Sequence, residues 1–371
     1  MKLGITSDWL NGDNHAGIAN YVHNLLKELI KIKNKDIYLI NYAKNEFTYK
    51  HNKIIIPNPL KGISKTVSWY LYLGVQNNRL KKLDIIHNPT QCPTFFRFKQ
   101  KYIFTVHDIT PLIDSKEHPI HRVLSYKLLL PRTLKTADKI IAVSNSTKKD
   151  LINYFDIPEE KIRVILNAAD EKFKPLSDKE VKETKQKYSL NFPFILYVGT
   201  LEPRKNIPSL IKAFYKLKKK NLQYKLVITG KKGWKYKEIF ETIDKLNLQN
   251  DVVFTGYVAD EDLPALYNAA DLFVYPSIYE GFGLPPLEAM ACGTPVITSN
   301  TSSLPEVVGD AGIMIDPPDV DGLADAMHEV LTNEGLRANM IKKGLGRAKM
   351  FSWEKCARET LEVYEEVYDE G

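Results

Sequence analysis

One stretch of the chain combines glycines and prolines in a pattern that could bind an anionic ligand. Gly281 and Gly283 let the backbone come close to a ligand, because glycine has no Cβ atom. Pro285 and Pro286 suit the first turn of a helix, where a missing N–H group costs little. The free N–H groups and the positive dipole at that helix N-terminus would favour a diphosphate.

Two carboxylates flank this predicted phosphate site. Glu280 lies in the glycine loop, and Glu288 follows a little further along the chain. Carboxylates beside an anion site need a separate function, and binding the hydroxyl groups of a sugar would supply one. The alternative is that Glu288 only decorates the helix N-terminus.

A second candidate segment, residues 199–206, comes directly after a predicted strand. Its adjacent cations, Arg204 and Lys205, could neutralise a leaving diphosphate as negative charge develops on it. The alternative is a solvated basic turn.

Two further segments contain candidate site residues, one after a predicted strand and one at the entry to the first predicted helix. His107, followed by Asp108, could act as a base, although a lone histidine is more often structural. Gly17 enters the first predicted helix, where a small residue lets the backbone approach a phosphate or an acceptor. An ordinary glycine turn is the alternative there.

The segment from Glu280 to Glu288 resembles the Glu-x7-Glu signature of glycosyltransferase family 4, the group 1 glycosyltransferases. Neighbouring matches are Pro-Val-Ile at residues 295–297 and Ser-Leu-Pro-Glu-Val at residues 303–307. The resemblance runs nearly end to end and is closest over residues 194–318. It implies the GT-B fold, an α/β architecture with two Rossmann-like, doubly wound parallel-sheet domains that face a central cleft.

The resemblance also implies roles for individual residues. Glu280 would contact the donor sugar and Glu288 the ribose of the nucleotide. Arg204 and Lys205 would stabilise the departing diphosphate, although many family members have a further arginine where this chain has Thr200. The other residues predicted to line the donor site are Gly17, Thr200, Tyr257, Gly281, Phe282, Gly283 and Leu284.

For the reacting sugar, the resemblance implies that His107 hydrogen-bonds one of its hydroxyl groups, with Asp108 as the usual neighbour. Family members usually have two glycines where this chain has Ala16 and Gly17. His-Asp-Ile-Thr-Pro-Leu at 107–112 and Gly-Lys-Lys-Gly-Trp at 230–234 resemble bacterial O-antigen mannosyltransferases.

The elements that must position these residues alternate between short β-like runs and helical patterns, which predicts two domains with parallel sheets. Ligands bind beyond the carboxyl ends of such strands, where the candidate residues are placed. A polar, lysine-rich segment interrupts the pattern at about 170–191. We therefore predict an acceptor-binding domain at 1–175 and a nucleotide-sugar-binding domain at 176–371, whose final helix, about 353–368, can pack back on the first domain.

Composition excludes several classes of protein. The three cysteines are far apart and lack the spacing of a zinc site, so a reducing cytoplasm is the simplest compartment. The first residues do not resemble a signal peptide. Asp319 and Asp321 form an Asp-x-Asp, but they open a predicted helix, so capping explains them better than a metal. We expect no metal or other cofactor, and the missing Gly-x-Gly-x-x-Gly fingerprint argues against an NAD enzyme.

The charge is uneven along the chain. Residues 1–175 hold 28 Lys and Arg against 16 Asp and Glu, about +12, and the rest holds 24 against 29, about −5. Aromatic and cationic residues interleave at 95–102, which suits an anionic membrane surface. Core packing of the rings and a solvated lysine surface are the alternatives. No nucleic-acid-binding module is present, so nucleic acid is not an expected partner.

These observations predict a retaining, metal-independent hexosyltransferase that uses a nucleoside diphosphate sugar as co-substrate. GDP-mannose is the first expectation for the donor and a UDP-hexose the second, with a glycan or lipid-linked acceptor. The alternatives are a sugar-nucleotide epimerase with the same fold, and a nucleotide-sugar binding protein without catalytic activity.

Overall fold

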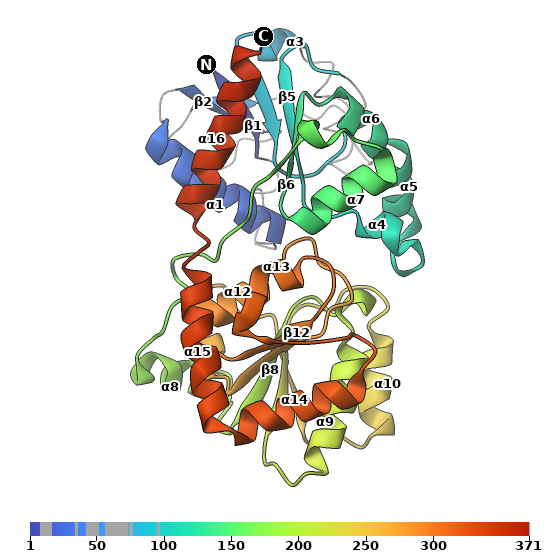
Figure 1. Cartoon of the computed structure of the whole chain (residues 1–371), viewed down its shortest axis with the longest axis vertical. Coiled ribbons are helices and arrows are strands. Elements are labelled where there is room, and N and C mark those ends of the chain that lie inside the picture. Colours follow the sequence, from blue (N-terminus) through green and yellow to red (C-terminus); the bar gives the residue numbers. More distant parts are fainter. Residues whose placement is uncertain are drawn as a thin grey trace. The chain divides into compact units, whose positions relative to one another are not determined.

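The computed structural model describes residues 1–7, 17–33, 36–41, 52–55, 73, 77–94 and 97–370. The chain forms two compact units, Met1–Asn167 together with Trp353–Gly371, and Ala168–Ser352. The division after Asn167 lies slightly before residue 175, where the sequence placed it. Each unit is built on one parallel sheet (Figure 1). The predicted class, two doubly wound parallel α/β domains, is confirmed.

The first unit has a seven-stranded sheet with the strand order β3-β2-β1-β4-β5-β6-β7. Its strands are β1 (Leu3–Thr6), β2 (Ile37–Asn41), β3 (Asn52–Ile55), β4 (Ile85–Asn88), β5 (Lys101–Val106), β6 (Lys139–Ala142) and β7 (Ile162–Val164). Its helices are α1 (Gly17–Ile32), α3 (Asn77–Leu80), α4 (Thr110–Ile113), α5 (Ile120–Leu128), α6 (Leu130–Thr136), α7 (Asn145–Phe155) and α16 (Trp353–Asp369).

The central strands of this sheet are buried on both faces, as expected of a parallel sheet covered by helices. In β5, Ile103, Phe104 and Val106 are all fully buried. The segment 120–136 forms two helices, α5 and α6, because Pro131 cannot continue a helix and lies in the first turn of α6. None of the helices in the described ranges has the length and apolarity needed to cross a membrane.

The last helix, α16, packs against α1 within the first unit (Figure 1). The rings of Tyr21 on α1 and Trp353 on α16 meet edge to face, with 5.8 Å between their centroids. Beneath them, the buried His87 hydrogen-bonds Tyr364 of α16 through Nδ1 (2.7 Å) and Thr105 through Nε2 (2.8 Å). Burial lowers the pKa of His87 to about 3, so the ring stays neutral and stabilises the packing of α16.

The second unit has a six-stranded sheet with the order β10-β9-β8-β11-β12-β13. Its strands are β8 (Phe194–Val198), β9 (Lys225–Thr229), β10 (Val252–Gly256), β11 (Leu272–Tyr275), β12 (Val296–Ser299) and β13 (Ile313–Ile315). Its helices are α8 (Asp178–Lys187), α9 (Ile207–Lys218), α10 (Lys237–Lys245), α11 (Leu263–Ala269), α12 (Leu284–Ala291), α13 (Leu304–Val308), α14 (Val320–Thr332) and α15 (Glu334–Ala348).

Strand order decides which loops meet in this unit. β8 and β11 are neighbours in the sheet although about 75 residues separate their loops in the sequence. The loops that follow them, at 199–206 and 276–283, therefore lie side by side at the carboxyl edge. Elsewhere, Asp319 caps α14 by accepting a hydrogen bond from Gly322 N at 2.8 Å, as the sequence predicted.

The aromatic stretch at 95–102 was predicted to lie at the surface, but its described aromatic side chains are buried. Phe98 is buried in the hydrophobic core of the first unit, and Tyr102 packs against it with 4.8 Å between ring centroids. Phe95 and Phe96 lie outside the described residues. Of the described aromatic side chains in this stretch, both contribute to the core.

Candidate active site

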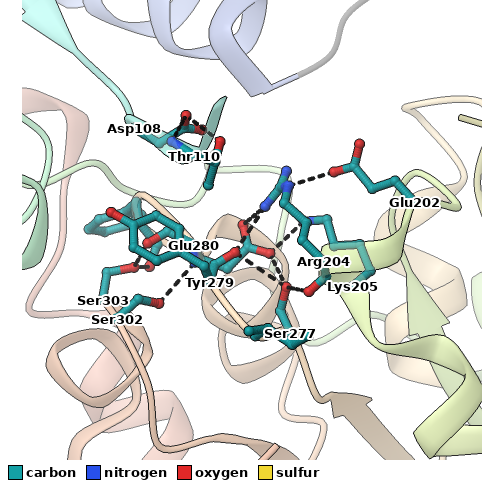
Figure 2. Close-up of polar contacts among 12 residues, drawn as sticks. Asp108, Thr110, Glu202, Arg204, Lys205, Ser277, Tyr279, Glu280, Ser302 and Ser303 are labelled. Carbon is teal, nitrogen blue, oxygen red and sulfur yellow. Dashed lines mark hydrogen bonds and ion pairs between the residues drawn. The ribbon is translucent and has the colours of Figure 1, made fainter. Parts of the chain in front are cut away.

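A buried cluster of ion pairs joins the two loops at the carboxyl edge of the second sheet (Figure 2). One oxygen of Glu280, Oε1, lies 2.5 Å from Lys205 Nζ, and the other, Oε2, lies 3.0 Å from Arg204 Nη1. Arg204 also pairs through Nε with Glu202 Oε1 at 2.6 Å. Ser277 donates a hydrogen bond to Glu280 Oε1 at 2.5 Å. The sequence thus singled out three of these residues, and the structure brings those three together.

The cluster balances two cations with two carboxylates. Balance is required because Glu280 and Lys205 are only 7% and 5% exposed, and an unpaired charge at such a depth is costly. Burial by itself would raise the pKa of Glu280, but the charges of Arg204 and Lys205 lower it to about 2. Glu280 is therefore ionised at neutral pH and can accept hydrogen bonds but cannot donate them.

Backbone contacts hold the two loops in register. Ile278 N donates to Arg204 O at 2.8 Å, and Ser277 Oγ lies 3.1 Å from the same oxygen. Arg204 Nη1 donates in return to Tyr279 O at 3.0 Å. Lys205 Nζ donates to the hydroxyl of Tyr275, the last residue of β11, at 2.5 Å. The side chains of Arg204 and Lys205 are fixed in place by the strand and loop that carry Glu280.

The glycine loop itself is stabilised by the segment after β12. Ser303 Oγ lies 3.0 and 2.7 Å from the carbonyl oxygens of Glu280 and Phe282 and shares its one proton between them, and Glu280 N donates to Ser302 Oγ at 2.9 Å. Gly283 begins α12 with φ of 106°, and a Cβ atom there would lie 2.8 Å from Leu304 Cδ2. Glycine suits this position because its φ lies in a region that residues with a side chain rarely adopt.

Glu288 lies apart from the ion-pair cluster, further along α12. Tyr267 of α11 donates a hydrogen bond to its Oε2 at 2.8 Å. Burial raises the pKa of Glu288 to about 7, so this carboxyl titrates near neutral pH. The two glutamates of the Glu-x7-Glu pattern thus differ in charge state, since Glu280 has cationic partners and Glu288 is bonded to a neutral phenol.

In the first unit, His107 follows β5, and its tautomer is fixed by a neighbour. His107 Nε2 lies 2.8 Å from the carbonyl oxygen of Pro89, which can only accept, so Nε2 carries the proton. Burial lowers the pKa of His107, which keeps the ring neutral. Nδ1 is then an acceptor suited to a sugar hydroxyl group.

The backbone at His107 and Asp108 is held by Gln91, a buried residue with φ of 57°. Gln91 Oε1 accepts hydrogen bonds from His107 N (2.5 Å) and Asp108 N (3.2 Å). Its Nε2 donates to Asp108 O and, at 2.9 Å, to the hydroxyl of Tyr126. Asp108 Oδ1 accepts from the N–H and hydroxyl of Thr110, so Asp108 shapes the turn into α4.

Three other predicted donor-site residues lie at strand or helix ends. Gly17 begins α1, and a Cβ atom there would meet nothing within 4 Å. Thr200 is exposed after β8. Tyr257 is exposed after β10, and Lys231 Nζ lies 4.4 Å from the centroid of its ring. Ala16, the neighbour of Gly17, lies outside the described residues.

The remaining predicted residues belong to the glycine loop. Gly281 and Phe282 are buried and Leu284 is half-buried. The ring of Phe282 packs edge to face on Phe351, with 6.0 Å between centroids. These residues determine the conformation of the loop and offer no polar side-chain group to a ligand.

Both halves of the chain match known families. Residues 178–347 match Glycosyl transferases group 1, and residues 15–173 match Glycosyltransferase Family 4. The chain is 40% identical to the O-antigen chain mannosyltransferase B of Escherichia coli over 267 residues, which cover 71% of this chain and 70% of that relative. The chain belongs to the group 1 glycosyltransferases.

A further relative and two solved structures are also similar to this group 1 glycosyltransferase. The serotype-specific mannosyltransferase WbdA of E. coli is 36% identical over 71% of this chain, which spans 33% of WbdA. Sucrose-phosphate synthase from Thermosynechococcus elongatus superposes with a TM-score of 0.79 and 21% identity over 100% of both chains. WaaG, a glycosyltransferase involved in lipopolysaccharide biosynthesis, superposes with a TM-score of 0.76 and 16% identity over 97% of this chain and 99% of its own. These structural likenesses confirm the GT-B fold.

Four residues that hold candidate site residues in place, one in the first unit and three in the second, were not predicted from the sequence. Gln91, Glu202, Ser277 and Ser303 each hold a predicted site residue in place. Glu202 and Ser303 lie within segments that the sequence highlighted, and a carboxylate two residues before Arg204 was the available signal for Glu202. Gln91 gave no local signal, because its partners come from a different strand.

Proposed function

We propose that this glycosyltransferase transfers mannose from GDP-mannose to a hydroxyl group of a glycan or lipid-linked acceptor, with retention of anomeric configuration. The observation that carries the proposal is the pairing of the ionised Glu280 with Arg204 and Lys205 beside the start of α12. The choice of mannose is supported by the similarity to proteins named as mannosyltransferases in E. coli.

The cluster suits the departure of a diphosphate. Arg204 and Lys205 are held in place by Glu280, Glu202 and Tyr275, so they need little reorganisation as negative charge develops on the leaving group. The positive end of the α12 helix dipole lies at the same edge of the sheet. Side chains and a helix terminus thereby supply the positive charge, and we propose catalysis without a divalent metal.

Glu280 and His107 have roles toward the sugar. The ionised carboxylate of Glu280 accepts hydrogen bonds from the hydroxyl groups of the donor sugar, and Nδ1 of the neutral His107 accepts another. No carboxylate is assigned as a covalent nucleophile. We propose a front-face reaction, in which the leaving phosphate helps to deprotonate the acceptor hydroxyl group.

Calorimetric titration tests the choice of donor. We expect GDP and GDP-mannose to bind more tightly than UDP and UDP-glucose, since the proposed donor is a guanosine nucleotide. Glu288→Ala should weaken GDP binding by about 1–3 kcal/mol, because Glu288 is proposed to hold the ribose through charge-assisted hydrogen bonds. A preference for UDP would replace mannose by the second candidate donor class, a UDP-hexose.

A further inference from the structure

Helix α5 carries an apolar stripe that faces solvent. Ile120, Leu124 and Leu128 are 71%, 47% and 71% exposed. They are spaced four residues apart, so they share one face of the helix. The opposite face buries Val123 and Tyr126 in the first unit. Nine large apolar side chains are exposed in the described part of the chain, and three of them lie on this single helix face.

Cations border the apolar stripe. Residues 120–136, which form α5 and α6, contain four Lys and Arg and no Asp or Glu. Lys127 lies three residues after Leu124 and seven after Ile120, so helical spacing places it along one border of the stripe. Arg132 and Lys135, on α6, are also exposed. The surface therefore combines exposed aliphatic side chains with a net positive charge.

This combination fits a lipid surface better than a protein partner. Helices that lie in the interface of an anionic bilayer have an apolar face bordered by Lys and Arg, so that the acyl chains and the headgroups are both satisfied. Protein interfaces, by contrast, concentrate their binding energy in Trp, Tyr and Arg, and leucine is under-represented there. Figure 1 shows α5 at the outer edge of the first unit, beside α4 and α6.

We propose that α5 is the membrane-docking surface of this glycosyltransferase, and that Ile120, Leu124 and Leu128 enter the acyl region of an anionic bilayer. The proposal rests on the proposed function in one respect, that a lipid-linked acceptor gives the enzyme a substrate at such a surface. It replaces the segment 95–102 as the apolar part of the docking surface, because Phe98 is in the core.

Co-sedimentation with vesicles tests this surface. The wild type should pellet with vesicles of phosphatidylglycerol and phosphatidylcholine, and much less with phosphatidylcholine alone. The double variant Ile120→Gln/Leu128→Gln should lower the partition coefficient by about tenfold or more, because it removes most of the exposed aliphatic area. Met350→Gln is the matched control, since Met350 is 62% exposed in the second unit and should leave partitioning unchanged.

The salt dependence of vesicle binding and a second variant separate the electrostatic contribution from the contribution of side-chain insertion. Arg132→Glu/Lys135→Glu should reduce binding at about 0.1 M salt, where the Debye length is about 10 Å, and matter little at about 1 M. GDP affinity and the thermal midpoint are measured on the same proteins, so loss of vesicle binding and loss of the donor site are distinguished. Wild-type protein that stays in the supernatant with anionic vesicles overturns the proposal. Vesicle binding that Ile120→Gln/Leu128→Gln leaves unchanged would also overturn it. A third contradicting result is a wild type that self-associates and does not bind vesicles, with the self-association lost in this variant.

Discussion

Lys205 and Glu280 form an ion pair with 2.5 Å between Nζ and Oε1, although 75 residues separate them in the sequence. The contact exists because β8 and β11, the strands before their loops, are neighbours in one parallel sheet. Both side chains are buried, so each charge depends on the other for its compensation.

Breaking this ion pair should cost both stability and binding. Lys205→Ala leaves the Glu280 carboxylate with one cationic partner fewer, and we expect a loss of about 3–5 kcal/mol in the free energy of unfolding. GDP affinity should fall by about 1–3 kcal/mol. Lys220→Ala, which removes a surface pair with Asp325, is the matched control and should cost at most about 1 kcal/mol.

The double variant Lys205→Met/Glu280→Gln separates the two effects. Removing both charges should restore much of the stability, because no buried charge is left without its partner, while GDP binding stays weak. Urea unfolding and calorimetry measure the two quantities. Wild-type GDP affinity in both Lys205 variants would remove Lys205 from the donor site.

Glu288 should make the stability of the protein depend on pH. Its pKa is raised from 4.5 to about 7 in the folded state, so between these values the folded protein binds more protons than the unfolded chain. Stability should therefore fall as pH rises from about 5 to 8, by about 1–3 kcal/mol from this half-buried group. Glu288→Gln should flatten that part of the profile, and Glu329→Gln, on the exposed face of α14, should not. Equal slopes in wild type and Glu288→Gln would contradict the raised pKa.

Substitutions at His107 test the role of its Nδ1 atom. His107→Asn can keep an acceptor near Nδ1, whereas His107→Gln can keep only the donor to Pro89 O. We expect His107→Gln to lower kcat about tenfold or more with GDP affinity intact, and His107→Asn to retain more activity. The reverse order would show that the contact with Pro89 is what matters.

Gln91 should act as a positioning residue for His107. Gln91→Glu keeps an acceptor for the two backbone N–H groups but loses the donor to Asp108 O, so the loop should shift. kcat should fall about tenfold while GDP affinity is unchanged. Gln100→Glu, at a half-buried glutamine that bonds Leu80 O instead, is the control. Equal losses in both variants would indicate general destabilisation.

Chelation tests the proposed independence from metal. Activity should survive EDTA, because Arg204, Lys205 and the start of α12 supply the positive charge beside the diphosphate. Complete loss of activity that Mg²⁺ or Mn²⁺ restores would contradict this and reopen the case for a metal-dependent mechanism.

The outcome shows which features the sequence can reveal. Arg204, Lys205 and Glu280 were predicted because each follows a strand and has a side chain whose chemistry is plain. Glu202 was not, because a carboxylate two residues before Arg204 gives no sign in the sequence of its burial. Ser277 was not, because its approach to Arg204 O depends on the adjacency of β8 and β11, which the order of elements along the chain does not reveal. Gln91 escaped for the same reason, since its partners follow β5 and it follows β4.

Exposure was the least predictable property. Ile120, Leu124 and Leu128 have the spacing of a core-facing helix stripe, and only the packing of α5 shows that they face solvent. Phe98 shows the reverse, an aromatic ring among cations that is buried. The spacing of the apolar residues predicts that they share one face of a helix, but it does not predict whether that face is buried or exposed.

The central claim is tested most directly by following GDP-mannose by NMR with and without a lipid-linked or oligosaccharide acceptor. The account predicts that GDP and an α-linked mannoside form together, and only when the acceptor is present, because a retaining transfer keeps the configuration of the donor. Acceptor-independent conversion of GDP-mannose into an isomeric sugar nucleotide or free sugar would contradict it, as would a β-linked product.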